Sequence, residues 1–319
     1  MKLLDKILPE SKEKRKQSAV LITILLALIL IIIGIYGVGK YGIALFLFIP
    51  AFIGISSTIL YGYKNEITRK EAFSIGHLTI GLLAVGLILF ALEGLICIVM
   101  AAPIVIVMTR LGTMIGLYIL ERWSDNSLAS VVILIIIIPL TAWAETNNSP
   151  RLENVTTSVI IDAKPEVVWK HVVEFPKLNE PEEFIFMVGI AYPIDATIEG
   201  RGAGAVRHCN FNTGSFVEPI VVWDEPQLLK FDVLEQPLPL RELSFWDIDA
   251  PHLHDYFVSR QGQFKLTELP GGKTRLEGTT WYYHDIAPAF YWRLWSEWII
   301  HSIHMRVLKH IKNNAECRH

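Results

Sequence analysis

The chain has 319 residues and a formal net charge of -3, and hydrophobic residues make up 52% of it. The first 150 residues hold 12 Lys and Arg against 9 Asp and Glu, whereas the remaining 169 hold 17 against 23. The mildly acidic second half lacks the concentrated positive charge of phosphate-binding surfaces, which argues against nucleic acid as a partner. The three cysteines fall in a predicted span, a predicted strand and the tail, so neither a disulfide framework nor a zinc site is expected.

Long stretches without a charged residue fill much of the first 144 residues. About 20 apolar residues in a helix cross about 30 Å of hydrocarbon, and a helix satisfies its own backbone in lipid. We therefore predict a multi-pass membrane region of four or five helices over residues 18–144. The expected spans lie near 18–39, 42–62, 74–92, 95–120 and 128–144.

The number of spans in the stretch from Glu93 to Leu120 is ambiguous, because it carries Glu93, Pro103 and Arg110 in an otherwise apolar sequence. It reads as one long span or as a broken one. A charge deep in a membrane is by default a functional-site hypothesis. Against that, Glu93 can lie at a helix boundary and Arg110 can extend toward the interface from a tilted span.

Basic residues predict the orientation of the membrane region. They concentrate in residues 1–17 and in the loop with Lys64, Arg69 and Lys70, so both segments are expected in the cytoplasm by the positive-inside bias. Five spans then place the C-terminal part outside the cytoplasm, which we favour. A re-entrant hairpin over 74–120 would place it inside.

Residues 145–152 are expected to be a linker, 153–314 a folded domain and 315–319 a tail. Alternation over 155–163 predicts a strand, and Pro165 is typical of a helix start. A less distinct helical piece near 180–190 precedes a series of strands that turn residues separate, and a long amphipathic helix covers 287–314. This order predicts an α+β domain in which a curved antiparallel sheet wraps around the last helix.

The domain resembles the START-like helix-grip superfamily, also called SRPBCC. The resemblance rests on the first strand leading into AKPEVVW, the central GRGAGAVRHCNFNTGSFVEPIVVWDEP, a late hairpin and the closing helix. That superfamily includes polyketide cyclases and dehydratases and lipid-transfer domains. It implies a cavity for a hydrophobic small molecule or lipid between the sheet and the helix.

A hairpin closed at Asn212 and Thr213 would place Arg207 opposite Glu218, as a cross-strand ion pair. On a solvated face such a pair contributes about 0 to 1 kcal/mol. Inside a cavity it would anchor a ligand carboxylate or hydroxyl. Both interpretations stay open, with the structural one favoured.

Histidines supply the weak catalytic candidates. His252 and His254 flank Leu253, and His301 and His304 share a helix face, but nothing in the sequence brings the two pairs together. The second pair also lacks the Glu of an HExxH zinc helix, so no metal site is predicted. A single pocket His, or Tyr283, remains possible as a general acid or base.

The stretch from 281 to 298 is rich in Trp and Tyr, which suit the wall of an apolar cavity, plain core packing or a belt at the bilayer interface. The leading hypothesis is a membrane-anchored domain that binds a hydrophobic small molecule or lipid. The alternatives are a cyclase- or dehydratase-like enzyme and a membrane-tethered docking module without a ligand. The predicted ligand-binding residues are Arg207, Glu218, His252, Tyr283, Trp292, Trp295 and Ile299.

Overall fold

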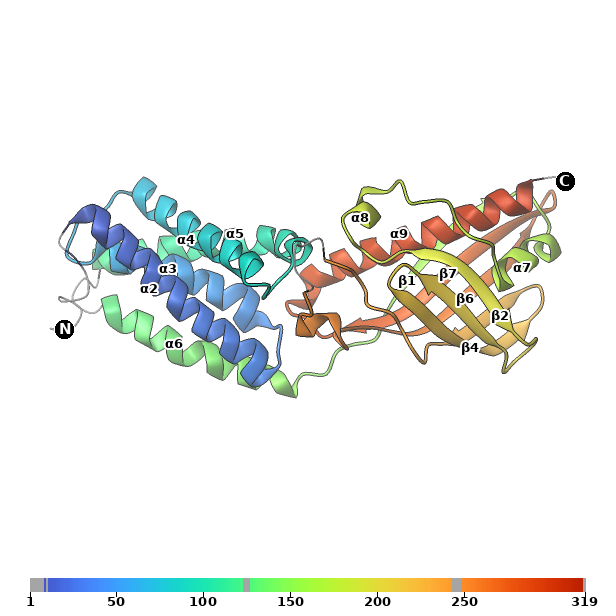
Figure 1. Cartoon of the computed structure of the whole chain (residues 1–319), viewed down its shortest axis with the longest axis horizontal. Coiled ribbons are helices and arrows are strands. Elements are labelled where there is room, and N and C mark those ends of the chain that lie inside the picture. The colour runs from blue at the N-terminus through green and yellow to red at the C-terminus, as the bar shows by residue number, and fades with distance from the viewer. Residues whose placement is uncertain (1–8, 10, 123–126, 243–247, 318–319) are drawn as a thin grey trace. The chain divides into compact units, whose positions relative to one another are not determined.

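The computed structural model describes residues 9, 11–122, 127–242 and 248–317. Three parts of the predictions lie outside this set: Lys2 and Lys6 of the predicted cytoplasmic N-terminus, the loop residues 123–126 and the end of the predicted tail. The chain divides into a helical unit, which consists mainly of the residues up to Ser149 and also includes Asp285–Pro288 and the segment that ends at Pro251, and a unit built on a β-sheet, which takes in most of the rest (Figure 1). Each unit is described by itself.

Within the described residues, five helices of the first unit are long and apolar enough to cross a membrane. The segment that was ambiguous in the sequence forms one helix with Pro103 inside it. Two of the five helices contain a π-helical part and the last ends in a 3-10 turn. The elements are α2 (Lys12–Ile32) with η1 (Ile33–Val38), η2 (Ala44–Phe48) with α3 (Ile49–Gly62), α4 (Arg69–Leu89), α5 (Leu95–Arg122), and α6 (Ser127–Ala144) with η4 (Glu145–Asn147).

The start of α4 shows how local sequence sets a helix end. Thr68 is the N-cap: its hydroxyl accepts from the backbone N–H of Glu71, and the Glu71 carboxylate accepts from the backbone N–H of Thr68. This capping box satisfies two backbone donors that the first turn leaves without helical partners.

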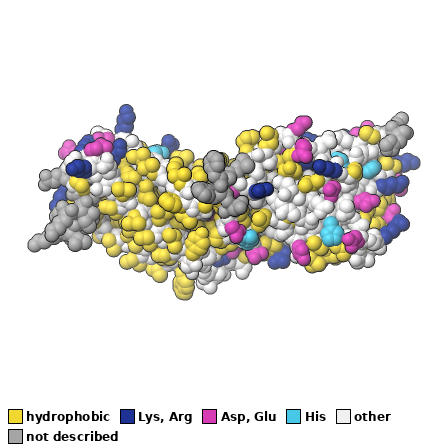
Figure 2. All heavy atoms as spheres, in the orientation of Figure 1, with side chains coloured by type: hydrophobic (Ala, Val, Ile, Leu, Met, Phe, Trp, Pro, Cys, Tyr) yellow, Lys and Arg dark blue, Asp and Glu magenta, His cyan; other side chains and the backbone are white. Residues whose placement is uncertain are grey.

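The outside of this unit is apolar, as Figure 2 shows over the face in view. Leu21, Leu25, Leu82 and Val85 are between 47% and 67% exposed. A water-soluble bundle would place polar residues on such a surface. The pattern is consistent with helices that cross a membrane.

The two charged residues predicted within the membrane region both have partners inside this unit. Glu93 lies in the connection between α4 and α5, where its Oε1 accepts a hydrogen bond of 3.2 Å from the Tyr41 hydroxyl. Arg110 lies on α5 and its Nε donates to Nε2 of His77 on α4, at 3.1 Å. A functional role for either residue stays a prediction.

Helices α3 and α5 approach closely because glycines face each other's backbone at the crossing. A Cβ on Gly54 would lie 2.2 Å from the carbonyl oxygen of Thr109. A Cβ on Gly112 would lie 2.0 Å from that of Ala51. Small residues of this kind allow helices to pack tightly where no water is available to drive association.

We expect Gly112→Ala to destabilise the helical unit by about 1–3 kcal/mol, because the new methyl group forces α3 and α5 apart. The measurement is thermal unfolding of the full-length protein in detergent. Gly81→Ala is the matched control, since a Cβ on that α4 glycine meets nothing within 4 Å. An unfolding midpoint for Gly112→Ala at or above that of the control would contradict the close-packing interpretation.

The second unit contains a seven-stranded sheet in the order β1-β7-β6-β5-β4-β3-β2, with every neighbouring pair antiparallel. Register shifts interrupt the pairings β2–β3, β4–β5 and β6–β7. Such irregularities increase the twist of a strand and help the sheet to curl. The strands are β1 (Glu153–Ile161), β2 (Pro193–Glu199), β3 (Val206–Phe211), β4 (Gly214–Asp224), β5 (Leu228–Asp232), β6 (Phe257–Leu269) and β7 (Lys273–His284).

Helices cover the concave side of this curled sheet (Figure 1). The long α9 (Ala289–Glu316) contributes Val307, Leu308 and Ile311 to the core, all at most 7% exposed. They pack in one cluster with buried residues of the sheet and of α7 (Pro165–Val173). The short α8 (Phe184–Met187) belongs to this unit, and so do the last two residues of η5 (Pro251–Leu253).

The predicted fold class is confirmed in both halves, and so is the hairpin register that pairs Arg207 with Glu218. Strand β2 was missed. It is an edge strand that pairs within the sheet with β3, and it begins with Pro193 and includes Asp195. Pro and Asp are uncommon in strand interiors, so an edge strand that contains them carries a weak sequence signal.

Candidate functional site

A cavity of about 130 Å³ lies between the concave face of the sheet and α9. Ile299, Ile303 and Val307 line it from the helix, and Phe231 and Phe264 from the sheet. The aliphatic and aromatic side chains outnumber the polar ones, so most of the wall offers no hydrogen bond. This is the usual composition of a site for a small organic ligand.

Gly262 on β6 shapes this wall, because it lies opposite Phe231 of β5. A Cβ at this glycine would be 2.4 Å from the Phe231 ring. The missing side chain therefore allows the ring to lie across the neighbouring strand, where it faces the cavity.

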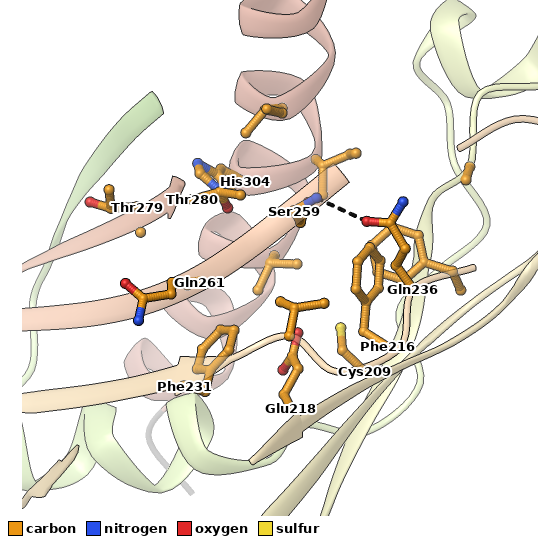
Figure 3. Close-up of a pocket in the computed structure, with 18 of the residues that line it drawn as sticks. Cys209, Phe216, Glu218, Phe231, Gln236, Ser259, Gln261, Thr279, Thr280 and His304 are labelled. Carbon is orange, nitrogen blue, oxygen red and sulfur yellow. Dashed lines mark hydrogen bonds between the residues drawn. The ribbon is translucent and has the colours of Figure 1, made fainter. Parts of the chain in front are cut away.

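The loop after β5 closes another side of the cavity with Pro237, Leu238 and Pro239. The side-chain amide of Gln236 fixes this loop to β6. Its Nε2 donates to the carbonyl oxygen of Phe257 at 2.7 Å, and its Oε1 accepts from the backbone N–H of Ser259 at 2.9 Å (Figure 3).

A buried ion pair is the most polar feature of the wall. The Arg207 guanidinium donates from Nη1 to Oε2 of Glu218 and from Nε to the carbonyl oxygen of Val173, at 3.2 Å. Arg207 is 1% exposed and Glu218 5% exposed. A lone charge in such a place would cost several kcal/mol, so each residue requires the other.

Burial is the largest single effect on the pKa of Arg207 and acts to lower it, but the interactions with Glu218 and Cys209 together raise that pKa above its ordinary value. Burial raises the pKa of Glu218, and Arg207 opposes that effect. We assign the pair as ionised, because a neutral Glu218 would leave the guanidinium charge without compensation. Burial also raises the pKa of the neighbouring Cys209 to about 12, so its thiol keeps its proton and is a poor nucleophile.

His304 of α9 adds a titratable group to the wall. Its Nε2 lies 2.8 Å from the hydroxyl of Thr280, and its Nδ1 lies 3.2 Å from that of Thr157. Burial, and after it His301, lowers the pKa of His304 to about 4. At neutral pH the ring is therefore uncharged, and hydroxyl groups face both of its nitrogens (Figure 3 shows Thr280 beside it).

The model of the polyketide cyclase/dehydrase and lipid transport family matches residues 153–316 of this chain. The chain belongs to this family. Its polyketide cyclase/dehydrase domain is the sheet unit described above, with the helix-grip arrangement of a sheet around a long C-terminal helix.

Solved structures similar to the polyketide cyclase/dehydrase domain include several enzymes. A truncated norcoclaurine synthase from Thalictrum flavum is 12% identical, with 54% of this chain and 99% of that chain covered and a TM-score of 0.36. The ZhuI aromatase/cyclase from Streptomyces sp. R1128 is 12% identical, with 52% and 94% covered and a TM-score of 0.33. A protein from Nitrosospira multiformis is 16% identical, with 52% and 97% covered and a TM-score of 0.34. No curated protein matches the chain.

The structure brings three of the predicted ligand-binding residues to the cavity of the polyketide cyclase/dehydrase domain: Arg207, Glu218 and Ile299. The others lie elsewhere. Trp292 and Trp295 are on the first two turns of α9, before the part that lines the cavity, and Tyr283 stacks under Arg260 with 5.1 Å between the guanidinium carbon and the ring centre. The catalytic candidates His252 and His254 lie in and beside η5, and neither lines the cavity.

Sequence reasoning did not select the residues that complete the wall, such as Phe231, Phe264, Gln236 and His304. For His304 a signal existed, because the spacing of His301 and His304 places them on one face of the helix. Which of the two faces the cavity depends on how α9 is rotated against the sheet. That rotation is a property of the packed domain.

We expect Arg207→Met to destabilise the domain by about 3–5 kcal/mol, because Glu218 would remain as an uncompensated buried charge. The double variant Arg207→Met/Glu218→Leu should recover most of this loss. The measurement is urea unfolding of the full-length protein, in which susceptibility of the domain to proteolysis reports the unfolded fraction.

The exposed pair Arg201–Glu225, with an Nη2–Oε2 distance of 3.0 Å, provides the control. Arg201→Met should barely change the unfolding midpoint, because water screens a pair at the surface. Equal effects at Arg207 and Arg201 would show that burial does not set the contribution of the Arg207–Glu218 pair.

The lowered pKa of His304 predicts a loss of stability in acid. Above pH 6.5, the ordinary pKa of His, the ring is neutral in the folded and in the unfolded chain, so its ionisation does not reduce the free energy of unfolding. Between pH 6.5 and about 4, His304 binds a proton in the unfolded chain but not in the folded chain. The free energy of unfolding therefore falls by about 1.4 kcal/mol per pH unit for one such group. His304→Gln should flatten the decline in unfolding midpoint between pH 7 and 5. Parallel pH profiles for the wild type and His304→Gln would contradict this assignment.

Proposed function

We propose that this protein is anchored in a membrane by its five apolar helices and binds a hydrophobic small molecule in the cavity of its polyketide cyclase/dehydrase domain. The observation that carries the proposal is the mainly apolar cavity between the sheet and α9, in which one ion pair and a few neutral polar groups are placed. Burial of ligand surface there would contribute roughly 25 cal/mol per Å² of apolar area.

The helical unit supports the membrane half of the proposal. Its five helices have the length and composition to cross a bilayer, and their outward side chains are apolar. The segment between Asn147, at the end of η4, and Glu153, where β1 begins, is short. The domain therefore stays near the bilayer, where hydrophobic molecules concentrate. The side of the membrane that it faces stays a prediction from the positive-inside bias.

Acid–base catalysis on a bound molecule is the second candidate, and the titratable groups of the cavity favour it less. The Glu218 carboxylate is engaged with Arg207. The pKa of His304, at about 4, makes it a weak base at neutral pH. The remaining alternative, a docking module filled by its own side chains, is disfavoured by the presence of a cavity.

A side chain that fills the cavity tests the binding function. We expect Ile303→Trp to abolish uptake of a hydrophobic ligand, because the indole would occupy the space between α9 and the sheet. Leu294→Trp is the control on the same helix: Leu294 is 64% exposed and does not line the cavity.

The measurement is native mass spectrometry of full-length protein extracted from membranes in detergent, together with binding of an apolar fluorescent probe. A small molecule that co-purifies with the wild type and Leu294→Trp, but not with Ile303→Trp, would support the proposal. Equal probe binding by all three proteins would place the ligand elsewhere and refute it.

A further inference from the structure

The size of the cavity restricts the ligand. An apolar cavity of about 150 Å³ in another protein holds a single benzene ring. The present cavity measures about 130 Å³. Interiors are close-packed, so the part of a ligand that lies inside this space is limited in size, whereas any further part would extend through the opening of the cavity. The space therefore suits a ligand of about one ring.

The ion pair restricts the polar chemistry of the ligand. Only Oε2 of Glu218 is bonded to Arg207, and within the described residues no donor reaches the other oxygen, Oε1. Figure 3 shows the Glu218 side chain projecting into the pocket between Phe231 and Cys209. The acceptor that faces the ligand is thus a carboxylate oxygen, and a hydrogen-bond donor is its natural partner.

Arg207 also lines the cavity, but its guanidinium is almost fully enclosed by aromatic rings. Its guanidinium carbon lies 5.6 Å from the ring centre of Phe175, 5.5 Å from that of Phe231 and 5.6 Å from that of Phe264. Its Nη1 and Nε bond to Glu218 and Val173, and only 1% of the residue is exposed. A ligand carboxylate could not reach this cation without disrupting the core, and it would meet the Glu218 carboxylate first.

The remaining polar groups of the wall carry no charge. His304 is neutral at pH 7, and both ends of the Gln236 amide are bonded to β6. Gln261 donates from Nε2 to Asp232 at 2.7 Å, and so is also fixed in place. The ion pair is balanced within itself, so a charged ligand would add an uncompensated charge to a site of low dielectric.

We propose that the ligand of this cavity is a small neutral molecule of about one ring that donates a hydrogen bond to Glu218, such as a phenol or a cyclic alcohol, and that carboxylates are rejected. This inference rests on the proposed binding function and specifies its ligand class.

Two matched ligand pairs and one size comparison test the proposal on the full-length protein in detergent, by isothermal titration calorimetry. Phenol and toluene differ by a hydroxyl in place of a methyl group. Benzamide and benzoate share one shape and differ in charge and in the donor. Titration of the Ile303→Trp variant, whose cavity is filled, measures the background heat of ligand that partitions into detergent micelles.

We expect phenol to bind at least tenfold more tightly than toluene, and benzamide at least tenfold more tightly than benzoate. 4-Phenylphenol should bind no more tightly than phenol, although its second ring would increase affinity in a larger cavity. Glu218→Gln should reduce the discrimination against benzoate at least tenfold. Should that variant fail to fold, the ligand series on the wild type still decides the question.

Each contrary result has a separate meaning. Benzoate binding as tightly as benzamide would overturn the charge selection, and toluene equal to phenol would overturn the donor requirement. Tenfold tighter binding of 4-phenylphenol, or a long-chain lipid that co-purifies, would overturn the size limit while the binding function stands. Failure of every aromatic probe and of co-purification together would overturn both proposals.

Discussion

The contact between α9 and the concave face of the sheet is the one on which the C-terminal domain depends. Val307, Leu308 and Ile311 lie in the core with at most 7% of their surface exposed, in one cluster with residues of α7 and the sheet. A curled sheet exposes a large apolar face, and α9 removes that face from water. Val307 also lines the cavity, together with Ile303 one turn earlier and Ile299 two turns earlier on the same helix. The core and the candidate site are therefore two parts of one interface.

The polar groups of this interface are arranged so that the cavity wall carries no net charge. Arg207 and Glu218 balance each other, three aromatic rings surround the guanidinium, and His304 is neutral between hydroxyl groups. Buried charges are tolerated in proteins when they are paired and hydrogen-bonded. Both residues line the cavity, and Glu218 is the more exposed of the two, at 5% against 1% for Arg207. This asymmetry makes the pair a candidate recognition element in addition to a structural one.

The helical unit obeys a different constraint. Its outer surface is apolar, and in a bilayer apolar burial alone would not hold such helices together, so close contact between backbones would become important. Gly54 and Gly112 provide that contact where α3 crosses α5. Under the proposed function, such a bundle would keep the cavity of the polyketide cyclase/dehydrase domain near a bilayer. A ligand that partitions into lipid would then reach the site from a concentrated source.

The sequence by itself determined the division into an apolar helical half and an α+β domain, because charge-free runs of about 20 residues and alternating patterns are local properties. It also determined the register of Arg207 against Glu218, since the short turn at Asn212 and Thr213 sets the pairing of the two strands it joins. The tertiary structure alone decided that this pair is buried and that His304 rather than His252 faces the cavity. It likewise decided that Trp292, Trp295 and Tyr283 lie away from the cavity wall, and that β2 completes the edge of the sheet. The physical reason is that a cavity is formed by residues distant in the chain. Their orientation depends on how a helix is rotated and how a sheet curls, which no local pattern encodes.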